Sequence, residues 1–181
     1  MSKIGRKPIL LNSVKVEIKD NVISLSATKG KITHVLPASL NIKHEKGTLI
    51  LGVNGKMDKD AKMNWGLHRA LLANEIKGID TGFEENIKIV GLGFKAQITG
   101  KKMIFSLGYS HKIDFEIPVG VEITVDKTGQ LLNVKAGDKR LLGQTCDTIR
   151  SFRPVEPYKG TGIIRENEFV IRKAGKSKTA A

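Results

Sequence analysis

Alternating hydrophobic and polar positions dominate the first quarter of the chain and predict half-buried β-strands. From Val14 to Ile18 every second residue is aliphatic and the residues between are charged. Strands are also predicted from Val22 to Ala27, from Lys31 to Leu36 and from Thr48 to Val53. Short turns rich in Asp, Asn and Gly separate the first three strands, which is typical of an antiparallel meander.

A helix is predicted after the fourth strand. Asp58 or Asp60 is suited to capping its first N–H groups, and the helix is expected to end near Gly78. The apolar residues within it recur at helical spacing and form one stripe that is able to cover a sheet: Ala61, Trp65, Leu72 and Ile76. His68 falls on this stripe, where a buried, hydrogen-bonded structural histidine is expected rather than a catalyst.

The second half of the chain repeats this order. Period-two alternation predicts strands over 94–99, 113–117 and 121–125, and a second helix is predicted from about Asp138 to just before Pro154. The segment "KITHVLPASLNI" from Lys31 also matches "KIDFEIPVGVEI" from Lys112, 81 residues later. A repeat of this length indicates a duplicated domain.

The predicted fold class is therefore α+β, with two tandem duplicated domains. Each is expected to hold an antiparallel β-sheet packed on one α-helix, with basic N- and C-terminal extensions. A short glycine-containing join at Thr81 to Phe83 separates residues 1–82 from residues 83–181.

Charge favours a polyanionic partner, nucleic acid first and an anionic membrane second. The chain has 31 Lys and Arg against 18 Asp and Glu, a formal charge of +13. Residues 1–7 contain three cations and no acid, and residues 150–181 contain eight cations and three acids, whereas residues 83–149 are nearly balanced. The ends of the chain are thus expected to reach the partner.

Several classes of site are not expected. The single Cys146 excludes an internal disulfide framework, and no Cys/His grouping has the spacing of a zinc site. No apolar run is long enough to span a bilayer or to serve as a secretory signal, so we expect a cytosolic protein. Neither a metal nor a cofactor is predicted.

The sequence also shows no convincing set of catalytic residues. "GLGF" at Gly91 to Phe94 lacks the third glycine of a dinucleotide loop and precedes a strand, so we interpret it as a tight bend where backbone approaches something closely. Cys146 has no convincing histidine partner, and the adjacent Glu84 and Glu85 project in different directions on a strand. We expect the chain not to be an enzyme.

Two polar loops are the candidate contact segments. "GYSHKI", from Gly108 to Ile113, gathers side chains that are able to contact phosphate, sugar or a base. "RPVEPYKGTGI", from Arg153 to Ile163, combines two prolines and two glycines with an aromatic ring and two cations. A plain surface turn would explain the prolines and glycines of these loops but not the ring and the cations.

These residues resemble bacterial large-subunit ribosomal protein six. The likeness runs from "SKIGRKPI" through "VGLGFKA" and "SLGYSHKIDFEIP" to "RPVEPYKGTGI" and the basic tail. The last motif departs from the family pattern at Val155, in a slot usually held by proline or a similar residue, and at Thr161, where lysine is usual. The second departure removes one expected phosphate contact.

The resemblance implies a non-enzymatic constituent of the large ribosomal subunit. It implies binding of 23S ribosomal RNA near the stalk base and the sarcin-ricin region, beside neighbouring ribosomal proteins and the docking site of translation factors. The second domain is expected to lie closest to the RNA.

The residues predicted to contact RNA come from both loops and both ends of the chain. They are Lys3, Arg6, Lys7, Tyr109, His111, Lys112, Arg153, Tyr158, Lys159, Gly160, Arg165, Arg172, Lys173, Lys176 and Lys178. The terminal segments are expected to order only on RNA. An RNA chaperone, an architectural DNA-binding protein and, more distantly, a small enzyme remain alternatives.

Overall fold

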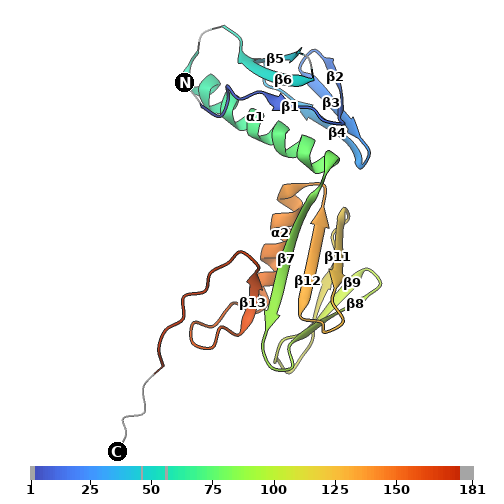
Figure 1. The fold of residues 1–181 in the computed structure, drawn as a ribbon, viewed down its shortest axis with the longest axis vertical. Coiled ribbons are helices and arrows are strands. Elements are labelled where there is room, and N and C mark those ends of the chain that lie inside the picture. Colours follow the sequence, from blue (N-terminus) through green and yellow to red (C-terminus); the bar gives the residue numbers. More distant parts are fainter. Residues whose placement is uncertain (1–2, 46, 56, 176–181) are drawn as a thin grey trace, which may run out of the picture. The chain divides into compact units, whose positions relative to one another are not determined.

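The computed structural model describes residues 3–45, 47–55 and 57–175 and divides into two compact units (Figure 1). The first unit comprises Met1–Phe83 with Gly137–Lys139, and the second comprises Glu84–Ala136 with Arg140–Ala181.

The first unit contains two three-stranded antiparallel sheets and one long helix. The strands pair in the orders β1-β6-β5 and β2-β3-β4. The elements are β1 (Ile9–Leu10), β2 (Lys15–Lys19), β3 (Val22–Ala27), β4 (Gly30–Val35), β5 (Leu40–Glu45), β6 (Thr48–Val53) and α1 (Lys59–Asp80).

Helix α1 packs against strands of both sheets and closes the core of the first unit (Figure 1). Ile23 and Leu25 of β3 are fully buried, as their alternation with serine predicts. Trp65 of α1 is 7% exposed, and its indole N–H donates to the backbone oxygen of Leu51 at 2.9 Å. The ring therefore joins the helix to β6 by both packing and a hydrogen bond.

Both ends of α1 lie where the sequence predicts them. Asp58 caps the helix, because its carboxylate accepts from the backbone N–H of Lys59 at 2.7 Å. The predicted end near Gly78 is confirmed, since the helix ends at Asp80. Gly78 is buried, and a Cβ there would lie 2.0 Å from the backbone oxygen of Gly137. The absence of a side chain at Gly78 therefore lets the helix pack closely against the backbone of Gly137.

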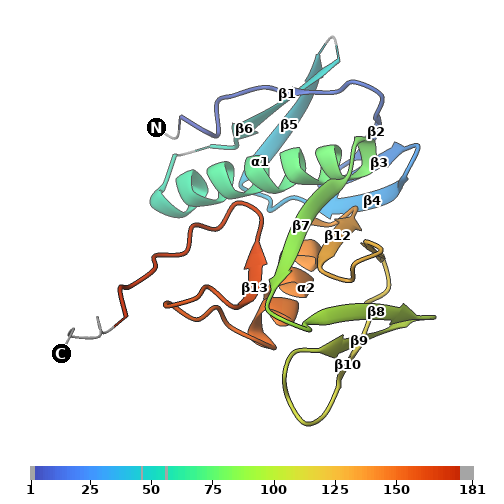
Figure 2. The ribbon, with the colours of Figure 1, turned by 60° about the horizontal axis from the view of Figure 1, so that its bottom comes forward.

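In its described residues the second unit has a four-stranded sheet in the order β11-β12-β7-β13, a three-stranded sheet in the order β10-β9-β8, and one helix (Figure 1 and Figure 2). The elements are β7 (Phe83–Val90), β8 (Lys95–Thr99), β9 (Lys102–Ser106), β10 (Ile113–Glu116), β11 (Val121–Val125), β12 (Leu131–Ala136), α2 (Lys139–Ser151) and β13 (Gly162–Arg165).

The core of the second unit lies between its sheets and α2. Leu142, Cys146 and Ile149 form the buried stripe of this helix. At the end of the helix Phe152 packs against Phe105 and Phe115, with ring centroids 5.4 and 5.7 Å apart. The loop that follows Phe152 therefore starts from a rigid base.

The duplication is visible in individual hydrogen bonds. Leu40 donates its backbone N–H to the oxygen of Pro37 at 3.0 Å. Val121, 81 residues later, donates in the same way to Pro118 at 3.2 Å. Each bond lies at the start of the strand that pairs with the last strand before the helix. The predicted α+β class and tandem duplication are confirmed.

The arrangement of strands differs from the prediction in detail. Each unit divides its strands between two sheets, and among the described residues six strands had no predicted range: β1, β5, β7, β9, β12 and β13. The alternation that predicts a strand is present in β12, because Leu132 and Val134 are buried and alternate with Asn133 and Lys135. No such alternation is found in β13, which has only four residues and begins with glycine. Pairing with β7 defines this strand.

Candidate nucleic-acid interface

The two candidate contact loops meet in the second unit. The guanidinium carbon of Arg153 lies 4.8 Å from the centroid of the Tyr109 ring, a cation–π distance. The Tyr109 hydroxyl donates to the backbone oxygen of Phe152 at 3.2 Å. His111 stacks beside Tyr109 with ring centroids 5.7 Å apart and planes at 17°. Two separately predicted segments therefore form one surface.

Phe94 lies beneath this junction and explains the glycines around it. The Arg153 guanidinium carbon is 5.9 Å from the Phe94 ring centroid. A Cβ on Gly91 would lie 2.4 Å from this ring, and one on Gly108, whose φ is +76°, would lie 2.8 Å from it. The close approach predicted for "GLGF" is therefore to the protein's own Phe94.

The loop from Arg153 to Gly162 is closed by internal hydrogen bonds. The backbone N–H of Glu156 donates to the oxygen of Thr161 at 2.9 Å, and Gly160 donates back to Glu156 at 3.1 Å. The Thr161 hydroxyl also donates to the Glu156 carboxylate at 2.8 Å. Thr161, which departs from the family pattern, thus stabilises the shape of the loop.

The exposed tip of this loop presents a ring and a cation. Tyr158 is 54% exposed, and Lys159 beside it is also exposed. The following tail lies against the loop, because Lys173 donates its backbone N–H to Pro157 at 2.8 Å. A Cβ on Gly160 would lie 3.0 Å from the Arg172 guanidinium, so Arg172 covers this glycine.

The remaining tail cations divide by position. Arg172 and Lys173 are exposed beside the loop. Lys176 and Lys178 lie outside the described residues.

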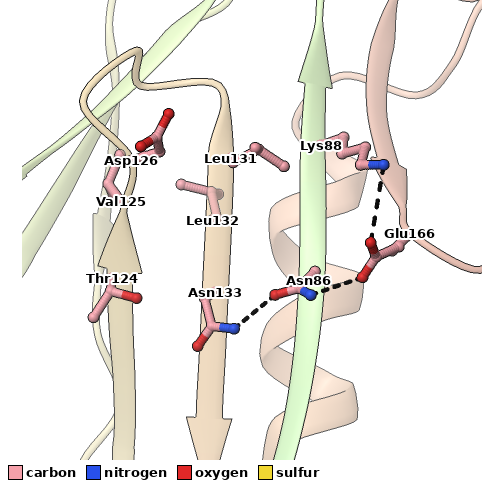
Figure 3. Close-up of a pocket in the computed structure, with 9 residues that line it drawn as sticks. All are labelled: Asn86, Lys88, Thr124, Val125, Asp126, Leu131, Leu132, Asn133 and Glu166. Carbon is pink, nitrogen blue, oxygen red and sulfur yellow. Dashed lines mark hydrogen bonds and ion pairs between the residues drawn. The ribbon is translucent and has the colours of Figure 1, made fainter.

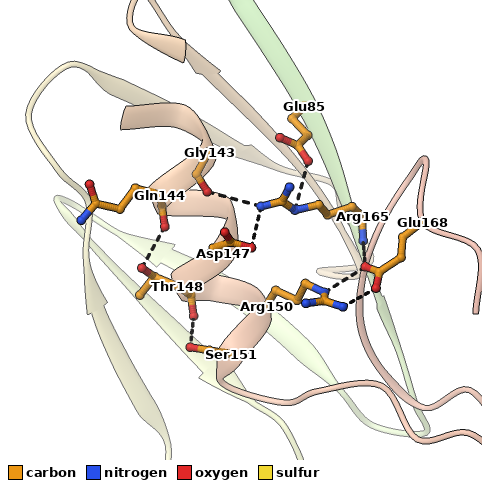
Figure 4. Close-up of polar contacts among 9 residues, drawn as sticks. All are labelled: Glu85, Gly143, Gln144, Asp147, Thr148, Arg150, Ser151, Arg165 and Glu168. Atoms are coloured by element: carbon orange, nitrogen blue, oxygen red, sulfur yellow. Dashed lines mark hydrogen bonds and ion pairs between the residues drawn. The ribbon is translucent and has the colours of Figure 1, made fainter. Parts of the chain in front are cut away.

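Arg165 differs from these cations because carboxylates already surround it (Figure 4). Its Nη2 lies 2.8 Å from a carboxylate oxygen of Asp147 and 3.3 Å from the backbone oxygen of Gly143. Its Nε lies 3.2 Å from the carboxylate of Glu85. These contacts join β13 to both α2 and β7.

A second arginine pair lies beside the first (Figure 4). Arg150 of α2 donates through Nε to the Glu168 carboxylate at 2.9 Å and through Nη2 to its other oxygen. These charge-assisted bonds hold the pKa of Glu168 below its ordinary value. The segment after β13 is thereby attached to the helix.

The N-terminal cations belong to a segment packed on the first unit, in contrast to the expected flexible arm. A Cβ on the buried Gly5 would lie 2.7 Å from the Trp65 ring, so the backbone rests on the indole. Arg69 of α1 donates to the backbone oxygens of Lys7 and Pro8 at 3.1 and 3.3 Å. The side chains of Lys3, Arg6 and Lys7 are exposed.

The residues considered for catalysis have structural surroundings. His68 is bonded through Nδ1 to Nε2 of His34 at 3.0 Å, and His34 Nδ1 lies 2.8 Å from Glu75. This chain of contacts joins α1 to β4, as expected of a structural histidine, but His68 is half-buried and not buried as predicted. Cys146 is fully buried, and burial first and then Glu85 raise the pKa of its thiol to about 12.

The adjacent glutamates serve different parts of the second unit. Glu84 accepts from Asn133 and lies 3.5 Å from Lys135, whereas Glu85 faces Arg165. Among the described residues no group of His, Cys, Asp and Glu is arranged to hold a metal ion. Neither α1 nor α2, the two helices in the described part of the chain, is long and apolar enough to cross a bilayer.

A depression of about 440 Å³ on the four-stranded sheet is lined by paired polar groups (Figure 3). Asn133 donates to Asn86 at 2.6 Å, and Asn86 donates to Glu166 at 2.7 Å. Lys88 lies 3.9 Å from Glu166. This ladder links three neighbouring strands and contains no nucleophile paired with a base.

Comparisons with known proteins relate the chain to one family. The family model described as ribosomal protein L6 matches residues 90–166. "Large ribosomal subunit protein uL6" of Syntrophomonas wolfei is 43% identical over 178 residues, which cover 98% of each chain. The protein of the same name from Magnetococcus marinus is 40% identical over 179 residues, covering 98% of this chain and 100% of that one. The chain belongs to the ribosomal protein L6 family, a family of structural proteins and not of enzymes.

Proposed function

We propose that this protein is a structural constituent of the large ribosomal subunit in the cytoplasm and binds 23S ribosomal RNA. The near full-length similarity to large-subunit proteins supports the first part. The convergence of the two loops at Arg153 and Tyr109 is the observation that carries the second part. Residues 83–181 are the principal RNA-binding domain of this proposal, and residues 1–82 form the other domain.

The second unit holds RNA chiefly by neutralising phosphates. Arg153, Lys159, Arg172 and Lys173 come from a closed loop and the tail bonded to it, so their charges are concentrated on one side. Binding of these cations to phosphates releases counterions from the RNA, which supplies affinity without reading sequence. Tyr158 offers an exposed ring for stacking on a base or packing on a sugar.

The "GYSHKI" loop extends this surface. His111, which stacks on Tyr109, and Lys112 are exposed and are suited to phosphate or sugar contacts. Tyr109 fixes the direction of the Arg153 guanidinium while 41% of its own surface stays exposed. Gly160 lets Arg172 lie close to the loop.

The ends of the chain supply further phosphate contacts. Lys3, Arg6 and Lys7 project from a segment held on α1 and need little additional ordering. Lys176 and Lys178 extend the run of tail cations in the sequence. The resemblance to the family favours RNA near the stalk base and the sarcin-ricin region, beside neighbouring ribosomal proteins and docking translation factors.

Cosedimentation and crosslinking test the proposal. A tagged chain is expressed in bacteria, the lysate is fractionated, and ultraviolet crosslinks are mapped on the attached RNA. We expect the chain in the large-subunit fractions, with crosslinks from the loop at 153–162 to a few clustered positions of 23S RNA. Recovery mainly off ribosomes, with crosslinks scattered over many RNAs, would favour an RNA chaperone instead.

A further inference from the structure

We infer that Arg165 positions the RNA-binding loop and does not itself bind phosphate, an inference that rests on the proposed function. The charge and location of Arg165 in the sequence suggest a phosphate ligand. Its side chain, however, is only 30% exposed and already lies within 3.2 Å of two carboxylates and 3.3 Å of a backbone oxygen. A phosphate at Nε or Nη2 would have to displace these partners.

The contrast with Arg153 is clear in the same unit. None of the ion pairs among the described residues involves Arg153, and its guanidinium lies on the faces of Phe94 and Tyr109. Aromatic faces leave the N–H groups at the edge of a guanidinium able to donate outward. Arg153 is thus ready for an anionic partner, whereas the charge of Arg165 is compensated by Glu85 and Asp147.

The position of Arg165 relates it to both ends of the loop. The loop leaves α2 after Ser151 and returns in β13 at Gly162. Arg165, at the end of β13, binds Asp147 and the Gly143 oxygen of α2 and also faces Glu85 of β7. It therefore holds the returning strand on the helix from which the loop departs (Figure 4).

The position of Arg165 requires the planar guanidinium group, whose N–H groups point in several fixed directions. One arginine donates through Nη2 to two acceptors of α2 and forms an ion pair with Glu85 of β7, which the point charge of a lysine does not do with the same geometry. The backbone bond from Ile163 to the oxygen of Arg153, 2.9 Å long, then transmits the placement of β13 to the first residue of the loop.

The test compares four variants of the full chain by filter binding to purified 23S ribosomal RNA at several salt concentrations, with transfer RNA as competitor. Circular dichroism and melting establish that each variant is folded at 25 °C. The variants are Arg165→Gln, Arg165→Lys, Glu85→Gln and, as matched control, Arg153→Gln.

The control should lower the slope of log K against log salt by about one, because it removes a phosphate contact. Arg165→Gln and Arg165→Lys should weaken binding about three- to tenfold with the slope unchanged, since an ordering contact is lost and no phosphate contact is. Glu85→Gln should weaken binding about two- to fivefold, although it removes a negative charge from this region.

The change in RNA affinity caused by Glu85→Gln has opposite signs for the two possible roles of Arg165, which are positioning the loop and binding phosphate. Tighter binding by Glu85→Gln, or a slope reduced by about one in Arg165→Gln, would assign Arg165 to phosphate and overturn the inference. Unchanged affinity in folded Arg165 variants would also overturn it, because a residue that only stabilises the fold does not alter binding at 25 °C. Failure of the unmodified chain to prefer 23S RNA over transfer RNA would instead reject the proposed function. If Arg165→Gln does not fold, the RNA affinity of Glu85→Gln still distinguishes the positioning role of Arg165 from phosphate binding.

Discussion

The guanidinium of Arg153 lies over the ring of Tyr109 at 4.8 Å, and this contact joins two loops from different parts of the second unit. The Tyr109 hydroxyl bond to Phe152 fixes the ring to the end of α2. A cation that is held by an aromatic face loses less side-chain entropy when it binds an anion. The aromatic pair therefore prepares the cation for RNA.

Replacing Tyr109 by Leu should weaken binding to 23S RNA about two- to fivefold, because the cation–π contact is lost. The salt slope should stay unchanged, since no cation is removed. Filter binding at several salt concentrations measures both quantities. Tyr109→Phe is the control that keeps the ring and should bind more tightly than the Leu variant; equal losses would show that the hydroxyl, and not the ring face, is what matters.

Replacing Arg153 and Lys159 together by Ala should reduce the salt slope by about two, one for each phosphate contact. Lys135→Ala is a matched loss of charge on the sheet face, where Lys135 lies 3.5 Å from Glu84, and should leave the slope nearly unchanged. The same titration serves all variants. A full slope in the double variant would remove this loop from the interface.

Replacing Trp65 by Ala should lower the unfolding free energy of the first unit by about 3 to 5 kcal/mol, because a large buried ring and its packing are lost. Urea denaturation followed by circular dichroism measures the change. Trp65→Phe keeps most of the ring volume and should cost less, mainly through the unpaired oxygen of Leu51. A change below 1 kcal/mol in the Ala variant is incompatible with the core position of the ring.

Stability of the first unit should fall as the solution is acidified. Burial first, and then the neighbouring His34, lower the pKa of His68 below its ordinary 6.5. The unfolded chain therefore binds a proton at higher pH than the folded unit does, so this contribution is complete above pH 6.5 and is lost as pH falls through the folded pKa. Melting curves between pH 7.5 and pH 5 of the unmodified chain and His68→Asn should show a weaker pH dependence in the variant; parallel curves would contradict this assignment.

The thiol of Cys146 should resist disulfide reagents at pH 8 in the native protein, because its pKa is raised to about 12 and its side chain is fully buried. One thiol should react on addition of denaturant. Spectrophotometric titration with an aromatic disulfide checks both states, and rapid native reaction would show that this part of the core opens.

Local pattern predicted much of the fold. Period-two alternation predicted the strand from Val121 to Val125 and its buried face, where Val121 and Ile123 lie. It also predicted the strand from Val14 to Ile18, although Ile18 is exposed. The 81-residue repeat indicates the duplication. The role of Gly78 was not predicted, because its close contact with the backbone oxygen of Gly137 arises only in the folded chain.

The sequence by itself determined the α+β class, the repeat, the basic ends and the two loops, because each is recorded in neighbouring residues or in regular spacing. Only the tertiary structure decided which cations are available. Arg153 and Arg165 are both arginines near one motif, yet the first lies on aromatic rings and the second lies between carboxylates. The energy of a charge depends on what surrounds it in space, and Tyr109, Glu85 and Asp147 reach these arginines only through the folding of the chain.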